Sequence, residues 1–532
     1  MKHHIQEKML SSPGGRAAVE EVDDIFRSAR ENGVTLWLDG DNLRYQGPKG
    51  SMTDALLELI RWSKGEVVAR LKGAGDSESF GSSFISCQRP NRAPLAFSQM
   101  AHWNAHRLYE RPSMRQIASS TCLEGRLDVD ALRSSLNEIV RRHDALHTRI
   151  VTCDGVPLQE VYEPYRVDLK VDDLTEIPEK SRQSKVIELV EQLILEPVDL
   201  AKGPLFGARL LKLRCDQHVL VLALDHMISD AFSAHILLRD LFLIYGQLLL
   251  PGVSFSLPEI TLQFPGYSIW LREVQKSRAS VHGEYWSARV ASCPRVNFPE
   301  DVDSESSNCA GWGTVPIHID KNLKAELREW CRVNQTTLAM SVFIAYVALV
   351  LRWCRVSDAV FQYQADGRVS QKIENTIGYF AVMLHLRVEV SLNDTFVDLL
   401  NRVTNEYCKA HEHPDFSYLE AQVPRPQFAH NAIFNWIPQE SKIDVSILDG
   451  TDYSLTAVPM PFAHPTLRSL DRDNEPALVL FDTDDVVVGG VHFPLNRFSL
   501  KLMERFRRNF FVFIEVLLRR KGDCVENIPL SS

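Results

Sequence analysis

A nearly continuous apolar run, Gln217 to His226 (QHVLVLALDH), limits the folds open to this chain. An apolar run of this length without polar alternation is typical of a strand that is buried on both faces, as in sheets covered by helices. A polar loop follows the run, and residues 233–250 are apolar nearly throughout, which predicts a buried helix. The sequence therefore predicts an α/β protein in which His226 lies at a strand-to-helix junction, a common place for reactive groups.

Strands and helices alternate along the rest of the main body, as an α/β fold requires. We expect strands at residues 117–123 and 359–364. We expect helices at residues 129–141, 321–333, 338–353 and 500–518. The longest apolar run, residues 338–351, is shorter than the ~20 residues that a membrane span requires, so we expect a buried helix and no membrane partner.

The N-terminal region predicts a small separate domain over residues 17–72. Apolar residues at helical spacing end at Gly33, and two strand-like segments, 34–38 and 43–46, flank a turn at 39–42. Two further helical segments complete an α-β-β-α-α order. The glycine-, serine- and acid-rich stretch that follows indicates a flexible linker, which we place at residues 73–93.

Charge and cysteine usage narrow the class of function. The formal net charge of −10 argues against nucleic acid as a partner, because such proteins normally present a basic face. The ten cysteines form no CxxC pair, which indicates reduced thiols and no metal site. The N-terminus lacks the apolar stretch of a signal peptide, so we expect a cytoplasmic protein.

The segment Asp225–Asp230 is the candidate reactive loop. Its histidine, His226, directly follows Asp225 and lies four residues before Asp230. A single histidine after a buried strand is more often a hydrogen-bonded core residue than a catalytic one. The ordinary pKa of imidazole near neutrality nevertheless suits it to remove a proton from a nucleophile or to hold that nucleophile in place. The residues of this loop alone leave both interpretations open.

The wider pattern resembles the condensation-domain superfamily of nonribosomal peptide synthetases, whose active-site motif is HHxxxDG. The segment DHMISDA, residues 225–231, matches the second histidine and the aspartate of that motif and departs at Asp225 and Ala231. Other family blocks follow the same order: PLAFSQ at 94–99, RHDALHT at 142–148, YSIW at 267–270, GR at 367–368, IGYF at 377–380, HEHPDF at 411–416 and FNW at 434–436.

The resemblance implies a fold of two subdomains, each like chloramphenicol acetyltransferase, that form a V-shaped pseudo-dimer with a tunnel between them. We place the subdomains at residues 94–275 and 276–520. It implies that His226 is catalytic and that Asp230 is structural and pairs with Arg368. The remaining residues that it places in the loop, the tunnel or the motifs are Asp225, Ser233, Gly378 and Asn435.

The first domain resembles the TubC-type N-terminal docking domain of assembly-line synthetases. The resemblance rests on the string GVTLWLDGDNLRYQGPKG at residues 33–50 and the helical segments after it. It implies that an exposed hairpin edge captures a short tail from an upstream protein, since an open strand edge offers unpaired backbone groups. Arg44, Lys49 and Arg61 could attract an acidic tail, although each is also explained as an ordinary solvated charge.

Together, the two resemblances imply a freestanding condensation enzyme. It would join an acyl thioester, carried on the phosphopantetheine of an upstream carrier protein with a C-terminal docking tail, to an amine or alcohol. The acceptor would be a free molecule or bound to a second carrier. The product is an amide or an ester, and we expect no cofactor bound by the enzyme itself.

Three alternatives stay open. Asp225, Asp230 and Ser233 also fit the DxxxxDxxS motif of heterocyclisation domains, although those domains normally lack a histidine at position 226 and have GDFT where this chain has IGYF. Epimerisation domains also carry HHxxxDG, and this chain matches their motif no better than it matches that of condensation domains. The alternative of a different class is a catalytically inactive scaffold that binds carrier proteins.

Overall fold

The computed structural model describes most of the chain beyond residue 88 and a short part before it. The described residues are 34–39, 42–46, 89–108, 113–114, 117–250, 252, 256–290, 296–302, 311–368, 370–391, 393–413, 432–438, 443–459, 475–519 and 524–530. The chain divides into two compact units, Met1–Ser86 with Ala325–Val342, and Cys87–Lys324 with Phe343–Ser532.

The N-terminal part of the first unit contains the expected hairpin. Strands β1 (Thr35–Asp39) and β2 (Asn42–Gln46) pair antiparallel, with Thr35 opposite Gln46 and Asp39 opposite Asn42. The backbone of Arg44 pairs with Trp37 within it. The side chain of Arg44, and Lys49 and Arg61 altogether, lie outside the described residues, as do the helices expected before and after the hairpin.

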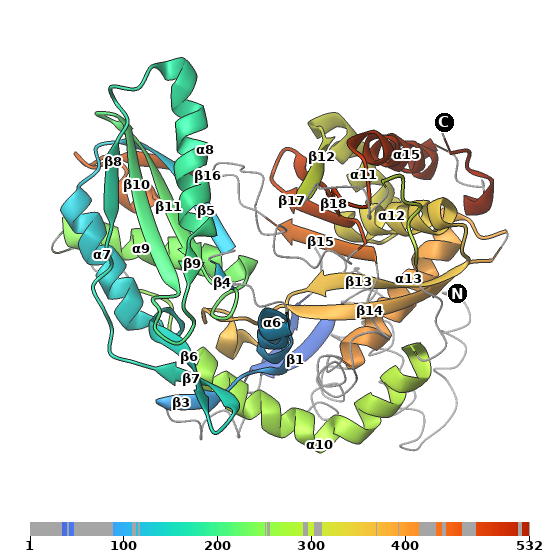
Figure 1. Cartoon of the computed structure of the whole chain (residues 1–532), viewed down its shortest axis with the longest axis horizontal. Helices are drawn as coiled ribbons and strands as arrows, with labels where there is room; N and C mark the ends of the chain where they lie inside the picture. Colours follow the sequence, from blue (N-terminus) through green and yellow to red (C-terminus); the bar gives the residue numbers. More distant parts are fainter. Residues whose placement is uncertain are drawn as a thin grey trace, which may run out of the picture. The chain divides into compact units, whose positions relative to one another are not determined.

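The first sheet of the second unit has five strands (Figure 1). Its order is β16 (Leu455–Pro459), β5 (Ile117–Gly125), β11 (Gln217–Leu224), β10 (Phe206–Arg214) and β8 (Lys170–Asp173). The β8–β10 pair is parallel and the other pairs are antiparallel. β16 comes from far along the chain, so the C-terminal half of the sequence completes a sheet built by the N-terminal half.

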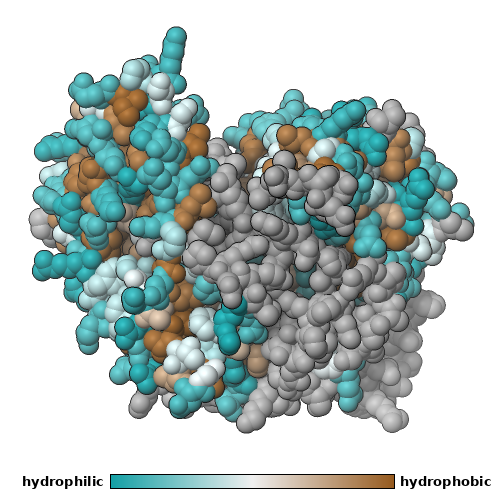
Figure 2. Space-filling model, in the orientation of Figure 1, coloured by the Kyte–Doolittle hydropathy of each residue, from teal (hydrophilic) through white to brown (hydrophobic). Residues whose placement is uncertain are grey.

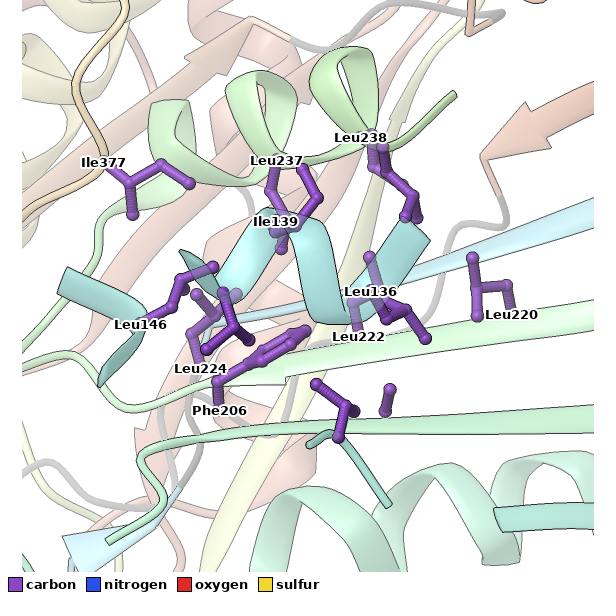
Figure 3. Packing of buried hydrophobic residues seen from close by; sticks show 14 of the residues in the cluster. Leu136, Ile139, Leu146, Phe206, Leu220, Leu222, Leu224, Leu237, Leu238 and Ile377 are labelled. Atoms are coloured by element: carbon purple, nitrogen blue, oxygen red, sulfur yellow. The ribbon is translucent and has the colours of Figure 1, made fainter. Parts of the chain in front are cut away.

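Strand β11 is buried because helices cover both faces of this sheet. Its alternate residues face two cores: Leu220, Leu222 and Leu224 pack in one cluster, and Val219, Val221 and Ala223 in the other. The first cluster includes residues of α7 (Val129–Arg142) and α9 (Ala231–Leu249), as Figure 3 shows, and the second includes residues of α8 (Glu179–Leu195). Burial on both faces explains the continuous apolar run in the sequence.

The second sheet has six strands. Its order is β12 (Trp312–Ile319), β18 (Val487–Pro494), β17 (Ala477–Asp482), β15 (Ala432–Pro438), β13 (Asp358–Ala365) and β14 (Val382–Glu389). The same unit contains the helices α13 (Phe396–Glu412) and α15 (Leu500–Arg519), whereas α11 (Lys321–Val333) and α12 (Leu338–Cys354) each have residues in both units. Phe343 of α12 lies against Phe361, Tyr363 and Phe434 of the sheet, with ring centroids 4.9 to 6.1 Å apart. The strands and helices expected in the main body are confirmed.

Smaller elements complete the second unit. One three-stranded sheet pairs β3 (Arg92–Pro94), β7 (Val156–Val161) and β6 (Thr148–Cys153), and a short sheet pairs β4 (Ser113–Met114) with β9 (Pro197–Val198). The remaining helices are α6 (Phe97–Leu108) and α10 (Phe264–Val290). Because β3 begins at Arg92, the end of the stretch expected to be a linker belongs to a strand, whereas residues 73–88 lie outside the described residues.

Helix α9 is long and apolar enough to cross a membrane, and among the described helices only the pair α11 and α12, bent by 97°, passes the same test when taken as one span. Of the tested stretch of α9, 61% is buried inside the protein. The apolar composition of α9 is therefore accounted for by the core that it shares with β11. The face drawn in Figure 2 shows mostly hydrophilic residues, with scattered hydrophobic ones, over the lobe that carries α7 and α8.

A buried histidine of β14 makes stability depend on pH. His385 is 3% exposed, and burial lowers its pKa to about 3. Between pH 6.5 and about 3 the unfolded chain binds a proton at this residue that the folded chain does not, so the free energy of unfolding falls as pH falls through this range. We expect urea unfolding at pH 7.0 and 5.5 to show that the free energy of unfolding falls less between these two pH values in His385→Gln than in the parent.

The matched control is His318→Gln, because His318 is exposed on β12 of the same sheet. It should keep the parental loss of unfolding free energy between the two pH values. An unchanged slope in His385→Gln would contradict the assignment of this acid sensitivity to His385.

Candidate active site

The segment between β11 and α9 forms a short loop fixed at both ends. At its start, the Asp225 N–H donates to the Leu205 carbonyl at 2.8 Å, next to the first residue of β10. At its end, Asp230 caps α9, since its Oδ1 accepts from the Ser233 N–H at 2.8 Å. Ala231 is the first residue of α9, so the position that is glycine in the family motif has helical backbone here and needs no glycine.

His226 is half-buried in this loop, with its ring held by the backbone. Its Nδ1 lies 2.9 Å from the carbonyl oxygen of Ser229. A carbonyl only accepts, so Nδ1 carries the hydrogen, and Nε2 of the neutral ring is the nitrogen that can accept a proton. Burial lowers the pKa of His226 by more than the charge of Asp230 raises it, which favours the neutral ring at pH 7.

Two further rings lie beside His226. The Tyr379 ring centroid is 4.4 Å from that of His226, and the His102 ring centroid is 5.7 Å from it. His102 and Tyr379 are themselves 6.3 Å apart, edge to face. Tyr379 stands inside the IGYF block at 377–380 without being singled out there, and His102 belongs to none of the sequence motifs. His102 comes from α6, more than a hundred residues before His226, and no spacing in the sequence connects them.

Asp230 and Arg368 form the expected pair, and both side chains are 3% exposed. Arg368 Nη1 donates to Asp230 Oδ2 at 2.8 Å, and Nη2 donates to Oδ1 at 3.1 Å. The N–H groups of Phe380 and Ala381 also donate to Oδ2, at 3.0 and 3.2 Å. Burial acts to raise the pKa of Asp230, but the charge and hydrogen bonds of Arg368 outweigh it, so this pKa lies below its ordinary value.

Aromatic rings enclose the Arg368 guanidinium. Its central carbon lies 4.8 Å from the ring centroid of Phe232 and 4.3 Å from that of Phe380. Such cation–π contacts stabilise a desolvated guanidinium further. Phe232, in the first turn of α9, is 45% exposed and therefore presents an apolar surface beside the loop.

Ser233 and Gly378 connect α9 to the segment that precedes β14. The Ser233 hydroxyl donates to the Gly378 carbonyl at 2.9 Å and accepts from the Gly378 N–H at 3.1 Å. A Cβ at Gly378 would lie 2.1 Å from the ring of Phe264, so only glycine fits this contact. Together with the Asp230–Arg368 pair, these bonds tie the loop of one half of the unit to the other half.

Asn435 and Asp225 have different surroundings. Asn435 is on β15, where its backbone pairs with Gln364 and Val479, and among the described residues no recorded bond or ring contact joins it to His226. Asp225 is fully buried at the base of the loop, and its carboxylate accepts from the Met227 N–H and from the Ser113 hydroxyl. A search of the described residues finds no group of three or more His, Cys, Asp or Glu side chains that could hold a metal ion.

The comparison with protein families decides the classification. Residues 90–464, more than half of the 532, match the Condensation domain family. This chain belongs to the condensation-domain family. Residues 22–72 match the TubC N-terminal docking domain, so the expected docking domain is also found.

Curated relatives of this condensation-domain protein are much longer than it is. One component of the linear gramicidin synthase of Brevibacillus parabrevis is 26% identical over 83% of this chain and 9% of its own length. Another component of the same synthase is 30% identical over 63% of this chain and 4% of its own length. The chain therefore spans less than a tenth of these relatives.

Solved structures share its fold. The SgcC5 protein from Streptomyces globisporus has a TM-score of 0.68 and 22% identity, covering 81% of this chain and 100% of that one. The X-domain in complex with OxyB, from teicoplanin biosynthesis, has a TM-score of 0.68 and 20% identity, covering 84% of this chain and 98% of that one. The first condensation domain of the calcium-dependent antibiotic synthetase has a TM-score of 0.66 and 18% identity, covering 83% of this chain and 99% of that one. The expected fold class is confirmed.

Proposed function

We propose that this condensation-domain protein joins an acyl thioester, delivered by a separate carrier protein on its phosphopantetheine arm, to an amine or alcohol acceptor. The observation that carries the proposal is the orientation of His226. Its Nδ1–H is held by the Ser229 carbonyl, so Nε2 is the basic nitrogen. A neutral, partly accessible imidazole with a fixed tautomer has what a general base requires.

In the proposed reaction, Nε2 of His226 removes a proton from the acceptor as its nitrogen or oxygen attacks the thioester carbonyl. The C–S bond of the resulting tetrahedral species then breaks, and the imidazolium returns the proton to the departing thiolate. The products are an amide or ester and a free carrier thiol, and His226 regains its starting state. Orientation of the two substrates supplies a further part of the rate enhancement.

The role proposed for Asp230 and Arg368 is structural. Both Asp230 oxygens are engaged, by Arg368 and by backbone N–H groups of Ser233, Phe380 and Ala381. A carboxylate with this many donors is a poor proton acceptor. We therefore infer that the pair fixes the loop and leaves the proton transfer to His226.

The heterocyclisation alternative requires reactive acids at the DxxxxDxxS positions, and the geometry disfavours it. The Asp225 carboxylate is buried against Ser113 and Met227, and that of Asp230 is bound to Arg368. The scaffold alternative has one supporting observation, since a structural relative is an X-domain in complex with another protein, OxyB. A scaffold would bind carriers without forming product.

The docking domain supports delivery of the donor by another protein. We propose that the hairpin β1–β2 binds the C-terminal tail of an upstream carrier, with Arg44, Lys49 and Arg61 attracting acidic residues of that tail. Strand addition at a hairpin edge forms backbone hydrogen bonds along the tail.

Mass spectrometry of one reaction tests both proposals. An acyl-loaded carrier, with or without its C-terminal tail, is incubated with the full chain and a panel of amines and alcohols. We expect an amide or ester product with the parent, a slower reaction with the carrier lacking its tail, and a product rate about 100- to 10,000-fold lower with His226→Gln. Carrier binding without product across the panel would favour the scaffold, and equal rates with both carriers would exclude the docking role.

A further inference from the structure

Asp225 replaces the first histidine of the family motif, and its side chain makes two hydrogen bonds inside the protein. Oδ1 accepts from the Met227 N–H at 2.8 Å. Oδ2 accepts from the hydroxyl of Ser113 at 2.5 Å. Asp225 has no exposed surface and Ser113 is 5% exposed, so water does not compete for these bonds.

The backbone of Asp225 organises the rest of the loop. Its carbonyl accepts from the Ser229 hydroxyl at 2.9 Å and from the Ile228 N–H at 3.1 Å. Ser229 is the residue whose own carbonyl holds Nδ1 of His226. A continuous series of hydrogen bonds therefore runs from Ser113 through Asp225 and Ser229 to the imidazole.

We propose that Asp225 and Ser113 form a positioning pair, which holds the Ser229 carbonyl beneath His226 and thereby keeps the hydrogen on Nδ1 and the basic nitrogen at Nε2. The consequence for turnover rests on the proposed condensation activity. The consequence for the tautomer does not, because it concerns the protein without substrate.

The chemistry of position 225 explains why its partner is a serine. A carboxylate only accepts, and the Met227 N–H and the Ser113 hydroxyl each donate to one of its oxygens. β4, which carries Ser113, is held by antiparallel pairing to β9, so the hydroxyl is presented from a fixed strand. Alanine at 113 would remove this donor from Oδ2. Asparagine at 225 would remove the charge, and its Nδ2 would either reverse the bond with the Ser113 hydroxyl or oppose the Met227 N–H.

The test reads the tautomer directly. Long-range ¹H–¹⁵N spectra of the ¹⁵N-labelled full chain distinguish imidazoles protonated at Nδ1 from those protonated at Nε2, and His226→Gln identifies the His226 signals by their loss. The variants are Ser113→Ala and Asp225→Asn. The control is Ser135→Ala, because Ser135 is equally buried but donates to the Ala131 carbonyl of its own helix, α7.

We expect Nδ1–H in the parent and in Ser135→Ala, and loss of that preference in Ser113→Ala and Asp225→Asn. Misplacement of the imidazole should lower kcat by up to about 100-fold in both variants, with KM little changed. Ser113→Ala is the milder change and decides the question alone if Asp225→Asn does not fold. Retention of Nδ1–H in a folded Ser113→Ala would overturn the pair. A tautomer shift in Ser113→Ala relative to a parent that forms no product would support the pair and reject the proposed reaction.

Discussion

Asp230→Asn should lower the free energy of unfolding by about 3–5 kcal/mol, because it leaves the Arg368 guanidinium buried without its charge partner. Asparagine keeps the volume of the side chain and can still cap α9 through Oδ1. Its Nδ2 replaces the oxygen that accepts from Arg368, Phe380 and Ala381, so the variant removes these acceptor contacts together with the charge. Asp366 also contacts Arg368, at 3.1 Å, but it is 47% exposed and cannot replace a buried carboxylate. Urea unfolding at pH 7 measures the effect.

The size of this effect depends on burial, and a second pair in the same unit provides the comparison. Asp172 and Arg209 join β8 to β10 at 2.6 Å, with side chains 31% and 15% exposed. Asp172→Ala should cost no more than about 1 kcal/mol, the usual range for partly solvated pairs. A similar loss in Asp172→Ala and Asp230→Asn would contradict the role given to burial.

A double-mutant cycle separates the pair from its surroundings. Arg368→Gln alone leaves the Asp230 carboxylate buried without its guanidinium, whereas Asp230→Asn with Arg368→Gln leaves no buried charge at either position. The double variant should therefore be destabilised by less than the sum of the two single variants. Additive losses would show that Asp230 acts through its backbone donors, Phe380 and Ala381, and not through Arg368.

Local patterns predicted the framework of this site, and the resemblance predicted its long-range pair. The buried run of β11, the polar loop and the apolar helix α9 follow from periodicity, which reports the environment of neighbouring residues. The pairing of Asp230 with Arg368, 138 residues apart, came only from matching two family blocks in order. Both features appear in the structure as expected.

Other parts of the site have no signal in a single sequence. Ser113 is bound to Asp225 across 112 residues, and it lies in a two-residue strand too short to produce a pattern. His102 reaches the site because α6 packs beside the loop, which depends on tertiary packing. β16 joins the first sheet from residues 455–459 for the same reason. Strand order across such separations is set by the cores that the strands share, not by local preference.

His226→Gln should reduce kcat/KM for product formation by about 100- to 10,000-fold, the usual contribution of a general base. Glutamine retains polar atoms but cannot take up the proton. In the parent, the groups that surround the imidazole are Asp230 with its partner Arg368, together with His102 and Tyr379. Burial lowers the pKa of His226 below the ordinary 6.5, so the parental rate should be level near pH 7 and fall only at lower pH.

The pH profile of kcat/KM distinguishes a base from a residue that only orients the acceptor. For a base, Nε2 must be unprotonated, so activity should decline with a midpoint below 6.5 as the ring gains a proton, and the residual rate of His226→Gln should lack that limb. His318→Gln, on the exposed side of β12, should keep the parental profile. A profile whose acid limb survives in His226→Gln would assign the titration to another group, with His102 the nearest imidazole, and would leave His226 a positioning role alone.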